Sequence, residues 1–328
     1  MREKIVNEIN QTIFSYISDP SLIQEEPVLQ EMLYYALGFR NDGTLLESGK
    51  RLRPLFCCLT CGVLSGSHES ALLYGAALEM LHNFTLIHDD IEDKSDTRHN
   101  RPTLWKRYGE ALAINAGDLL FEIALSAAAA SDTIINKFGL RRIMTMTEYL
   151  FLGQHRDISF ENRTDITESE YLKMVEGKTA ALLGCSFALG AIAGRADGKT
   201  TKAFQTAGQK IGIAFQIQDD YLGTWGEAGK LGKSVSSDIK DKKNTLAVVY
   251  TSANDPDFAQ KWQSYDGCAD RVQEFSSMME KSGAPEYLQE QSKKYMDEAK
   301  NILLPYRTEG EYQLILDDII DSLTGRNK

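Results

Sequence analysis

The chain has 328 residues, 42% of them hydrophobic, and a formal net charge of −11 at pH 7. This length allows one large or two ordinary domains with a substantial core. The acidic balance disfavours a nucleic-acid-binding protein, so any functional basic residues must be concentrated locally.

The residue usage predicts an all-α fold, and no linker stands out that would divide residues 1–328, which we take as a single domain. Ala, Leu, Glu and Lys are plentiful, whereas aromatic and β-branched residues are modest in number, which favours helices. No convincing strand is found, and a capping box at Thr167 and Glu170 marks one helix start. A turn is expected at 41–43 and a glycine-rich loop at 223–234. The expected helices cover 1–18, 27–38, 50–64, 68–93, 110–130, 132–160, 167–194, 198–222, 242–253, 255–281, 284–304 and 308–323.

The cysteines and the apolar runs indicate a cytoplasmic protein without a transmembrane segment. Five cysteines and no signal peptide are typical of reduced thiols. Cys58 and Cys61 form a CxxC pair, but together with Cys57 they lie in an apolar helical run, so we interpret them as small core residues rather than metal or redox ligands. No uninterrupted apolar run reaches the ~18 residues of a membrane span.

A cluster of acids ends the expected helix 68–93. Asp89 and Asp93 lie one turn apart on the same face, and like charges at that spacing, at a helix C-terminus, are unfavourable without a counter-ion. Oxygen ligands without a nearby cysteine favour Mg²⁺. A solvated acidic helix end is the alternative. His82, two turns earlier, and the basic residues at 98–101 favour a site for metal and diphosphate.

A second acidic turn strengthens this interpretation. Asp219 and Asp220 follow Gln216 by about one turn at another helix end, so two acid-tipped helices are expected to face each other across a cavity. Basic residues that could bind phosphate occur in four groups. Any single one of these residues, taken alone, would be typical of a solvated surface. The four groups are Lys50–Arg53, Arg98–Arg101, Lys178, and Lys233 with Lys242 and Lys243.

Together these motifs resemble the trans-isoprenyl diphosphate synthases of the polyprenyl synthetase family, over nearly the whole chain and in the family's order. The matching motifs are Gly49–Pro54, His82, Asp89–Asp93, Arg98–Thr103, Gly153-Gln154 with Asp157, Lys178-Thr179, Phe215–Asp220, and Lys233 through Lys243–Leu246. The resemblance implies the isoprenoid synthase fold, a single large helical bundle around a central cavity, a homodimer, and magnesium-dependent prenyl transfer in the cytoplasm.

The resemblance also implies roles for individual residues. Lys50, Arg53 and His82 would bind the diphosphate of isopentenyl diphosphate, with His99 beside them. Asp89, Asp93 and Asp219 would hold Mg²⁺. The allylic diphosphate would be bound by Arg98, Lys178, Lys233 and Lys243, with Thr179 and Gln216 near the developing cation. The allylic carbon–oxygen bond would ionise, the isopentenyl double bond would attack, and a proton would leave with diphosphate.

The sequence departs from the family pattern at two positions. His99 stands where many members have a second Arg, so either isopentenyl binding is weaker or Arg101 substitutes. Gly223 stands where the second motif has its last Asp. With Asp219 and Glu227, this spacing loosely resembles the metal triad of class I terpene cyclases. A cyclase on the same fold and a non-catalytic partner subunit are therefore alternatives, although the isopentenyl motifs argue against the former and the retained aspartates against the latter.

Product length is predicted from the residues that precede Asp89. A helix rises about 5.4 Å per turn, close to one isoprene unit, so the allylic tail would pass Thr85 and run towards Leu81. The resemblance implies that an aromatic residue at Phe84 stops growth near twenty carbons. We therefore predict geranylgeranyl diphosphate, with farnesyl or twenty-five-carbon products as rivals and a plain core role for Phe84 as the alternative. The allylic starter, the pathway and the roles of Asp90 and Asp220 stay open.

Overall fold

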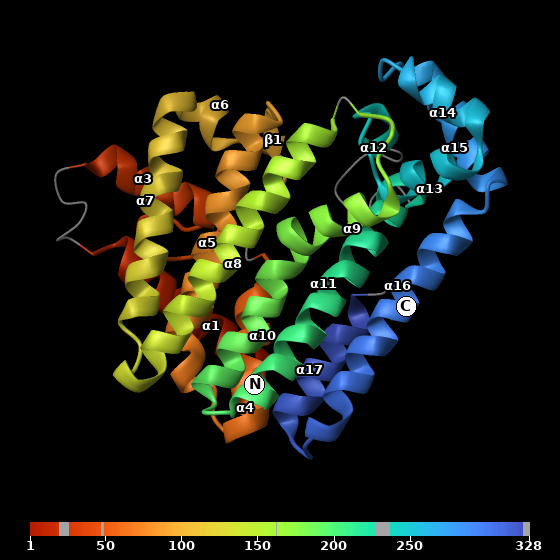
Figure 1. The fold of residues 1–328 in the computed structure, drawn as a ribbon. Helices are drawn as coiled ribbons and strands as arrows, with labels where there is room; N and C mark the ends of the chain where they lie inside the picture. The colour runs from red at the N-terminus through yellow and green to blue at the C-terminus, as the bar shows by residue number, and fades with distance from the viewer. Residues whose placement is uncertain (20–25, 47–48, 162, 227–236, 324–328) are drawn as a thin grey trace. The chain divides into compact units, whose positions relative to one another are not determined.

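The computed structural model describes residues 1–19, 26–46, 49–161, 163–226 and 237–323, and its fold is all-α, as the composition predicts (Figure 1). The chain divides into two compact units. Unit 1 comprises Met1–Met144, Cys185–Lys202 and Tyr306–Leu316, and unit 2 comprises Thr145–Gly184, Ala203–Pro305 and Asp317–Lys328. The single domain over 1–328 stays a prediction.

Unit 1 is built around α5, whose apolar residues recur on all sides and are buried. This helix packs along α7 and also contacts α4 and α1 (Figure 1). The cysteines of α4, at 57, 58 and 61, are fully buried, and burial raises the pKa of each thiol. They therefore behave as small core residues. The helices are α1 (Arg2–Ile17), α3 (Pro27–Leu37), α4 (Leu52–Ser65), η1 (Glu69–Ala71), α5 (Leu72–Glu92), α6 (Leu104–Tyr108), α7 (Glu110–Ala129) and α8 (Thr133–Phe160), of which α8 continues into unit 2.

A short hairpin in unit 1 corrects the expectation that the chain has no strand. Strands β1 (Thr97–Arg98) and β2 (Arg101–Pro102) pair antiparallel, joined by His99 and Asn100. Both turn residues have positive φ, 50° and 58°, as a two-residue type I′ turn requires. Asn tolerates this conformation better than most residues. The strands are too short to leave a periodic signal in the sequence.

Unit 2 holds most of the remaining helices around an aromatic core. Trp262 and Phe275 meet edge to face with ring centroids 5.1 Å apart, and Phe258 stacks on Trp262. The elements after α8 are α9 (Glu168–Val175), the π-helix η2 (Glu176–Ala180), α10 (Ala181–Ala193), α11 (Gly198–Trp225), α12 (Ser237–Lys240), α13 (Leu246–Asn254), α14 (Pro256–Gln263), η3 (Ala269–Arg271), α15 (Val272–Lys281), α16 (Ala284–Leu303), η4 (Leu304–Tyr306) and α17 (Glu311–Ser322). The predicted capping box at Thr167 and Glu170 is confirmed.

Several expected boundaries were wrong for identifiable reasons. The helix expected at 255–281 is broken after Gln263, where Gly267 has φ 83° and the Tyr265 hydroxyl donates to the Cys268 carbonyl. The helix expected from 242 begins at Leu246, because Thr245 caps it. In the opposite sense, α11 continues through Gly223 to Trp225, and most of the predicted glycine-rich loop lies outside the described residues.

Two helical segments are long and apolar enough, by length and mean hydropathy, to cross a membrane. The expectation from the sequence that no segment spans a membrane rested on a different criterion, the length of uninterrupted apolar runs. In Glu168–Ala193, 83% of the most apolar window is buried, so this segment is a core element. In Glu110–Ala129, 44% of the window is buried. The latter helix therefore presents apolar surface outward.

Candidate active site

A basic cavity of about 410 Å³ lies in unit 1 between the segment before α4, one face of α5 and the β1–β2 hairpin. The four residues predicted to surround isopentenyl diphosphate, Lys50, Arg53, His82 and His99, all line it. Arg98 and Arg101 also line this cavity, whereas Glu79 and Asp90 are its acids. Cations outnumber anions around the cavity, so its field favours an anionic ligand.

Arg53 presents a buried donor that an anionic ligand would satisfy. Its Nε is buried and has no hydrogen-bond partner among the described residues. Burial lowers the pKa of the guanidinium, and only the nearby charge of Glu79 opposes this shift. Because a buried donor without a partner is costly, this nitrogen fits a site that is completed by a bound anion.

Arg51, to which the sequence assigns no role, organises the cavity from behind. It is buried and adopts a left-handed conformation with φ 45° immediately before α4. Its guanidinium donates to Glu79 Oε1 at 2.7 Å, Asn10 Oδ1 at 3.1 Å and the Leu37 carbonyl at 3.0 Å. Three segments are thereby joined to the loop that carries Lys50. Nothing in the sequence distinguishes Arg51 from its basic neighbours.

His82 faces the cavity from α5 in a strongly cationic environment. Burial lowers the pKa of its imidazole well below the usual value, and the charges of Arg53, Arg98, Arg51 and His99 lower it further. The imidazole is therefore neutral at pH 7. A neutral imidazole can donate one N–H to phosphate while adding no repulsion to the surrounding cations.

The three aspartates of the first acidic motif divide between two environments. Asp89 is in the last turn of α5, partly exposed, and Asp93 follows as the exposed C-cap. Asp90 is buried instead, and its Oδ1 accepts from Arg98 Nε at 2.9 Å and Nη2 at 2.8 Å. Asp90 thus anchors Arg98, whereas Asp89 and Asp93 lie one turn apart at the end of the helix and are more exposed.

Arg101, the proposed substitute for the second Arg, is held by an aromatic side chain. Its guanidinium lies 4.1 Å from the ring centroid of Tyr35, and the Tyr35 hydroxyl donates to the Pro102 carbonyl. Both Tyr35 and Arg101 line the cavity, as does His99. The hairpin therefore brings a second guanidinium to the cavity where the sequence has His99.

In unit 2, two glycines bring Lys178 close to α8. A Cβ at Gly153 would collide with the backbone nitrogen of Lys178, and a Cβ at Gly177 would collide with the carbonyl of Tyr149. The contact occurs at the π-helix η2, a type of irregularity that often marks functional sites. Lys178 Nζ then reaches Asp157 Oδ2 at 2.5 Å. The motifs at 153–157 and 178–179 are therefore parts of one local structure.

A hydrogen-bonded chain links Thr179 to the second acidic motif. Thr179 Oγ1 donates to Gln216 Oε1 at 2.8 Å, and Gln216 Nε2 donates to Asp220 Oδ1 at 2.9 Å. Asp220 also accepts from the hydroxyl of buried Tyr171 at 2.5 Å and from the Leu246 amide at 2.8 Å. Burial is the main cause that raises the pKa of Asp220 to about 7. Asp220 is thus an internal acceptor, and sequence reasoning missed Tyr171.

The remaining residues of the second motif face different surroundings. Asp219 is partly exposed on α11. At Gly223 a Cβ would collide with the carboxylate of buried Asp238, which gives a packing reason for glycine where the family has an aspartate. Lys243 is exposed between α12 and α13. Lys233 and Glu227 lie outside the described residues.

The predicted chain-length residues lie on α5 as expected. Leu81 is fully buried, Thr85 is half-buried, and Phe84 is buried with its ring centroid 5.1 Å from that of Phe121 on α7. Phe84 also contacts the ring of His88. Phe121, which sequence reasoning missed, therefore supports Phe84 from the neighbouring helix.

The aspartates fit a hard divalent ion that takes few protein ligands. Within the part of the chain that the structure describes, no three His, Cys, Asp or Glu side chains gather closely enough to form a complete metal site. Mg²⁺ commonly takes one or two carboxylates and fills its shell with water and substrate phosphate. Asp89 and Asp93, which lie one turn apart, suit that requirement.

The pKa of His82 predicts a pH dependence of stability. The unfolded chain takes up a proton at His82 near pH 6.5, whereas the folded chain does so only at a lower pH. The free energy of unfolding should therefore fall as pH decreases from 7 to 5, by at most about 1.4 kcal/mol per pH unit from this group. Urea unfolding at both pH values should show a smaller decrease for His82→Asn than for the unmodified chain. His155→Asn, at an exposed histidine of α8, is the control; equal decreases in all three proteins would contradict this prediction.

The sequence profile described as polyprenyl synthetase matches residues 40–281. A geranylgeranyl diphosphate synthase from Sulfolobus acidocaldarius is 41% identical over 256 residues, which cover 76% of this chain and 72% of that protein. A (2E,6E)-farnesyl diphosphate synthase from Mycobacterium tuberculosis is 37% identical over 232 residues, covering 70% of this chain and 65% of that protein.

The fold is similar to that of solved structures over nearly the whole chain. The structure of a geranylgeranyl pyrophosphate synthetase from Pyrococcus horikoshii Ot3 matches with a TM-score of 0.90 and 31% identity, covering 99% of this chain and 98% of that one. The profile match and these similarities agree with the order of motifs along the sequence. The chain belongs to the polyprenyl synthetase family of prenyltransferases and is a short-chain trans-prenyl diphosphate synthase.

Proposed function

We propose that the chain condenses isopentenyl diphosphate with an allylic diphosphate, in a magnesium-dependent reaction, to give geranylgeranyl diphosphate. The observation that carries the isopentenyl half of the proposal is the basic cavity of unit 1, with the buried, unpartnered Nε of Arg53 at its wall. A diphosphate there would accept from Arg53, Lys50 and neutral His82. His99 lies beside them, and Arg101 brings a further guanidinium to the cavity.

The allylic diphosphate is assigned to Arg98, Lys178, Lys233 and Lys243. Two of these have their side chains held in place: Arg98 by Asp90, and Lys178 by Asp157. Charged hydrogen bonds from such cations stabilise a leaving diphosphate. Asp89, Asp93 and Asp219 would hold Mg²⁺, which, when bound, supplies charge neutralisation for the diphosphate.

The proposed reaction needs positioning and electrostatics rather than a protein nucleophile. The allylic carbon–oxygen bond breaks, and its electron pair leaves with diphosphate. The isopentenyl double bond then attacks the allylic carbon, and the lost proton passes to the departing diphosphate. Thr179 and Gln216, which are hydrogen-bonded to each other, present side-chain dipoles that stabilise the developing cation.

The cyclase alternative loses support at Gly223, where the metal triad would need an oxygen ligand and Asp238 fills the space beside the backbone. The non-catalytic alternative has no specific support either, because Asp89, Asp93 and Asp219 are all retained. We therefore propose one catalytic polyprenyl synthetase domain, acting in the cytoplasm.

The activity is tested by incubating the protein with isopentenyl diphosphate, each allylic starter and magnesium, and identifying the products. We expect prenyl diphosphate formation that requires isopentenyl diphosphate and is abolished by a chelator. Asp89→Asn and Asp219→Asn should each lower kcat by about a hundredfold or more, the scale of losing one group that stabilises transition-state charge. Asp96→Asn is the matched control, since this exposed acid pairs with Lys106. Cyclised products formed without isopentenyl diphosphate would refute the proposal.

The length of the product provides a second test. If Phe84 forms the floor of the tail pocket, Phe84→Ala should shift products from geranylgeranyl diphosphate to longer chains, as judged by mass spectrometry. Phe121→Ala removes the ring behind Phe84, so it should give a smaller shift in the same direction. Unchanged product length in Phe84→Ala would assign this residue to the core alone.

We also propose that the chain forms a homodimer through α8. Met144, Phe151 and Ile158 follow one another at seven-residue steps and are 60%, 47% and 40% exposed. Phe138 and Leu152 add to this exposed apolar stripe. A seven-residue apolar repeat suits packing against another helix, and an identical copy satisfies it in a two-fold arrangement.

Light scattering on the purified protein should give twice the chain mass of 36.7 kDa. Phe151→Glu combined with Leu152→Glu should give the monomer mass, because charge at the centre of an apolar interface is strongly unfavourable. Gln289→Glu, at an exposed polar position of α16, is the control. A monomeric unmodified protein, or binding of the stripe to lipid vesicles instead, would contradict the proposal.

A further inference from the structure

The segment between α12 and α13 carries Lys243 on a tightly folded backbone. Lys242 has a positive φ of 51°, and its amide donates to the Ile239 carbonyl at 3.0 Å. The Lys243 amide donates to the Asp238 carbonyl at 2.9 Å. Because the Lys243 side chain is exposed, its position depends on how firmly this segment is attached to the rest of unit 2.

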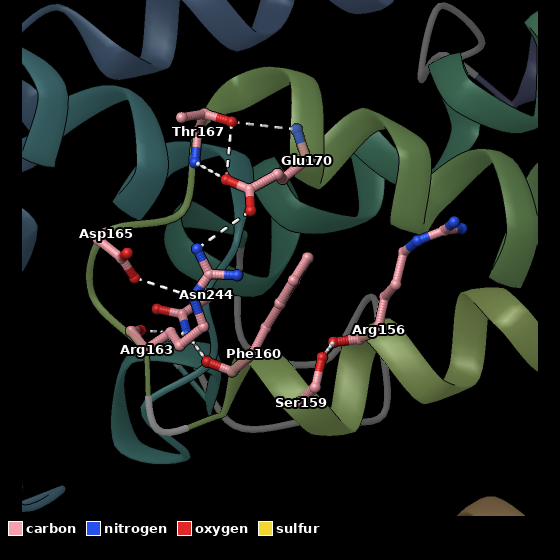
Figure 2. Close-up of polar contacts among 8 residues, drawn as sticks. All are labelled: Arg156, Ser159, Phe160, Arg163, Asp165, Thr167, Glu170 and Asn244. Carbon is pink, nitrogen blue, oxygen red and sulfur yellow. Dashed lines mark hydrogen bonds and ion pairs between the residues drawn. The ribbon is translucent and has the colours of Figure 1, made fainter.

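Asn244 attaches this segment to the end of α8 (Figure 2). Its Nδ2 donates to the carbonyls of Phe160, at 2.7 Å, and Arg163, at 3.0 Å. Phe160 is the last residue of α8, and its carbonyl also accepts from the Arg163 amide at 2.9 Å. The Asn244 amide is thus a second donor to this carbonyl and ties the segment to the end of α8. On its other side, Trp262 Nε1 donates to Asn244 Oδ1 at 3.4 Å.

The loop that receives Asn244 is itself braced. The Arg163 guanidinium pairs with Asp165 at 2.9 Å and Glu170 at 3.0 Å (Figure 2). Glu170 also accepts from the Thr167 amide and hydroxyl in the capping box of α9. Asn244 therefore contacts a segment that is fixed at both ends, by α8 and by α9.

A second anchor lies two residues further along the chain. The Leu246 amide donates to Asp220 Oδ2 at 2.8 Å, and Thr245 caps α13 between the two anchors. Lys243 is thus directly followed by residues bound to α8 and to α11. Of the two anchors, Asn244 is adjacent to Lys243, and its contacts are neutral hydrogen bonds to backbone carbonyls.

We propose that Asn244 is a positioning residue that sets the Lys243 ammonium for the allylic diphosphate. This inference rests on the proposed function, specifically on the assignment of Lys243. Without the Asn244 contacts the segment keeps its fold at α13 but loses the tie on the Lys243 side. Binding of the allylic diphosphate should weaken, whereas isopentenyl diphosphate, assigned to residues of unit 1, should be unaffected.

The experiment compares steady-state kinetics of Asn244→Asp, which keeps the shape but removes the Nδ2 donor, with those of the unmodified enzyme. We expect the KM for the allylic diphosphate to rise about tenfold, the scale of one or two lost hydrogen bonds. The KM for isopentenyl diphosphate should stay within about twofold. In a Lys243→Ala background, Asn244→Asp should add no further rise, because its effect passes through Lys243.

Asn254→Asp is the matched control, since Asn254 Nδ2 donates to the Tyr250 carbonyl at 2.8 Å on an exposed part of α13. It should leave both KM values unchanged. Equal rises in the two KM values, an additive double variant, or no change in Asn244→Asp would overturn the inference while leaving the function intact. If Lys243→Ala itself leaves the allylic KM unchanged, the assignment of Lys243 fails, and the inference fails with it.

Discussion

The basic half of the candidate site depends on the ion pair between the buried carboxylate of Asp90 and the guanidinium of Arg98. The carboxylate accepts two hydrogen bonds from Arg98 and so ties the β1–β2 hairpin to the end of α5. Removing either partner of this buried pair would be strongly unfavourable, because the other charge would be left uncompensated. With Arg98 held, the short hairpin turn brings His99 and Arg101 to the same cavity. Cation–π contact with Tyr35 then holds Arg101.

The second acidic motif shows the same division between an inner and an outer aspartate. Asp220 is buried and accepts from Tyr171, Gln216 and the start of α13, whereas Asp219 is partly exposed. In both motifs, therefore, the second aspartate is occupied by protein donors. The more exposed aspartates, Asp89 and Asp219, are among the residues to which the family resemblance assigns the divalent ion. The question left open by the sequence, what Asp90 and Asp220 do, has a structural answer: each organises the segment that carries a phosphate-binding candidate.

Accumulating cations in one cavity is costly, and the chain offsets that cost in several ways. Arg51 is neutralised by Glu79 and Arg98 by Asp90. His82 is neutral at pH 7, because burial and its cationic neighbours lower the pKa of the imidazole. The Nε of Arg53 is a buried donor without a hydrogen-bond partner among the described residues. This arrangement leaves a small surplus of positive charge for a ligand, within a protein whose overall charge is −11.

Much of the architecture follows from local patterns, and the errors occur where distant segments intervene. Helix positions came from apolar periodicity and caps, both of which act within a few residues. The break after Gln263 was missed because the apolar pattern continues across it, while the packing of Tyr265 and Trp262 against Phe275 decides the path. The π-helix at Glu176–Ala180 was missed because it arises where Gly153 and Gly177 allow two backbones to touch.

The sequence by itself determined the all-α class, the family and the set of charged residues available to the chemistry, because these depend on residue types at fixed spacings along the chain. It could not distinguish Arg51 from Lys50 or Asp90 from Asp89, since neighbours in sequence differ only in which way their side chains point. Tertiary structure decided those roles. The hydrogen-bond partners that decide these roles come from other elements of the chain. Arg51 pairs with Glu79, Asp90 with Arg98, Asp220 with Tyr171, and Asn244 with the Phe160 carbonyl. Burial against those partners turns one residue of each neighbouring pair into a structural anchor, whereas the other residue is more exposed.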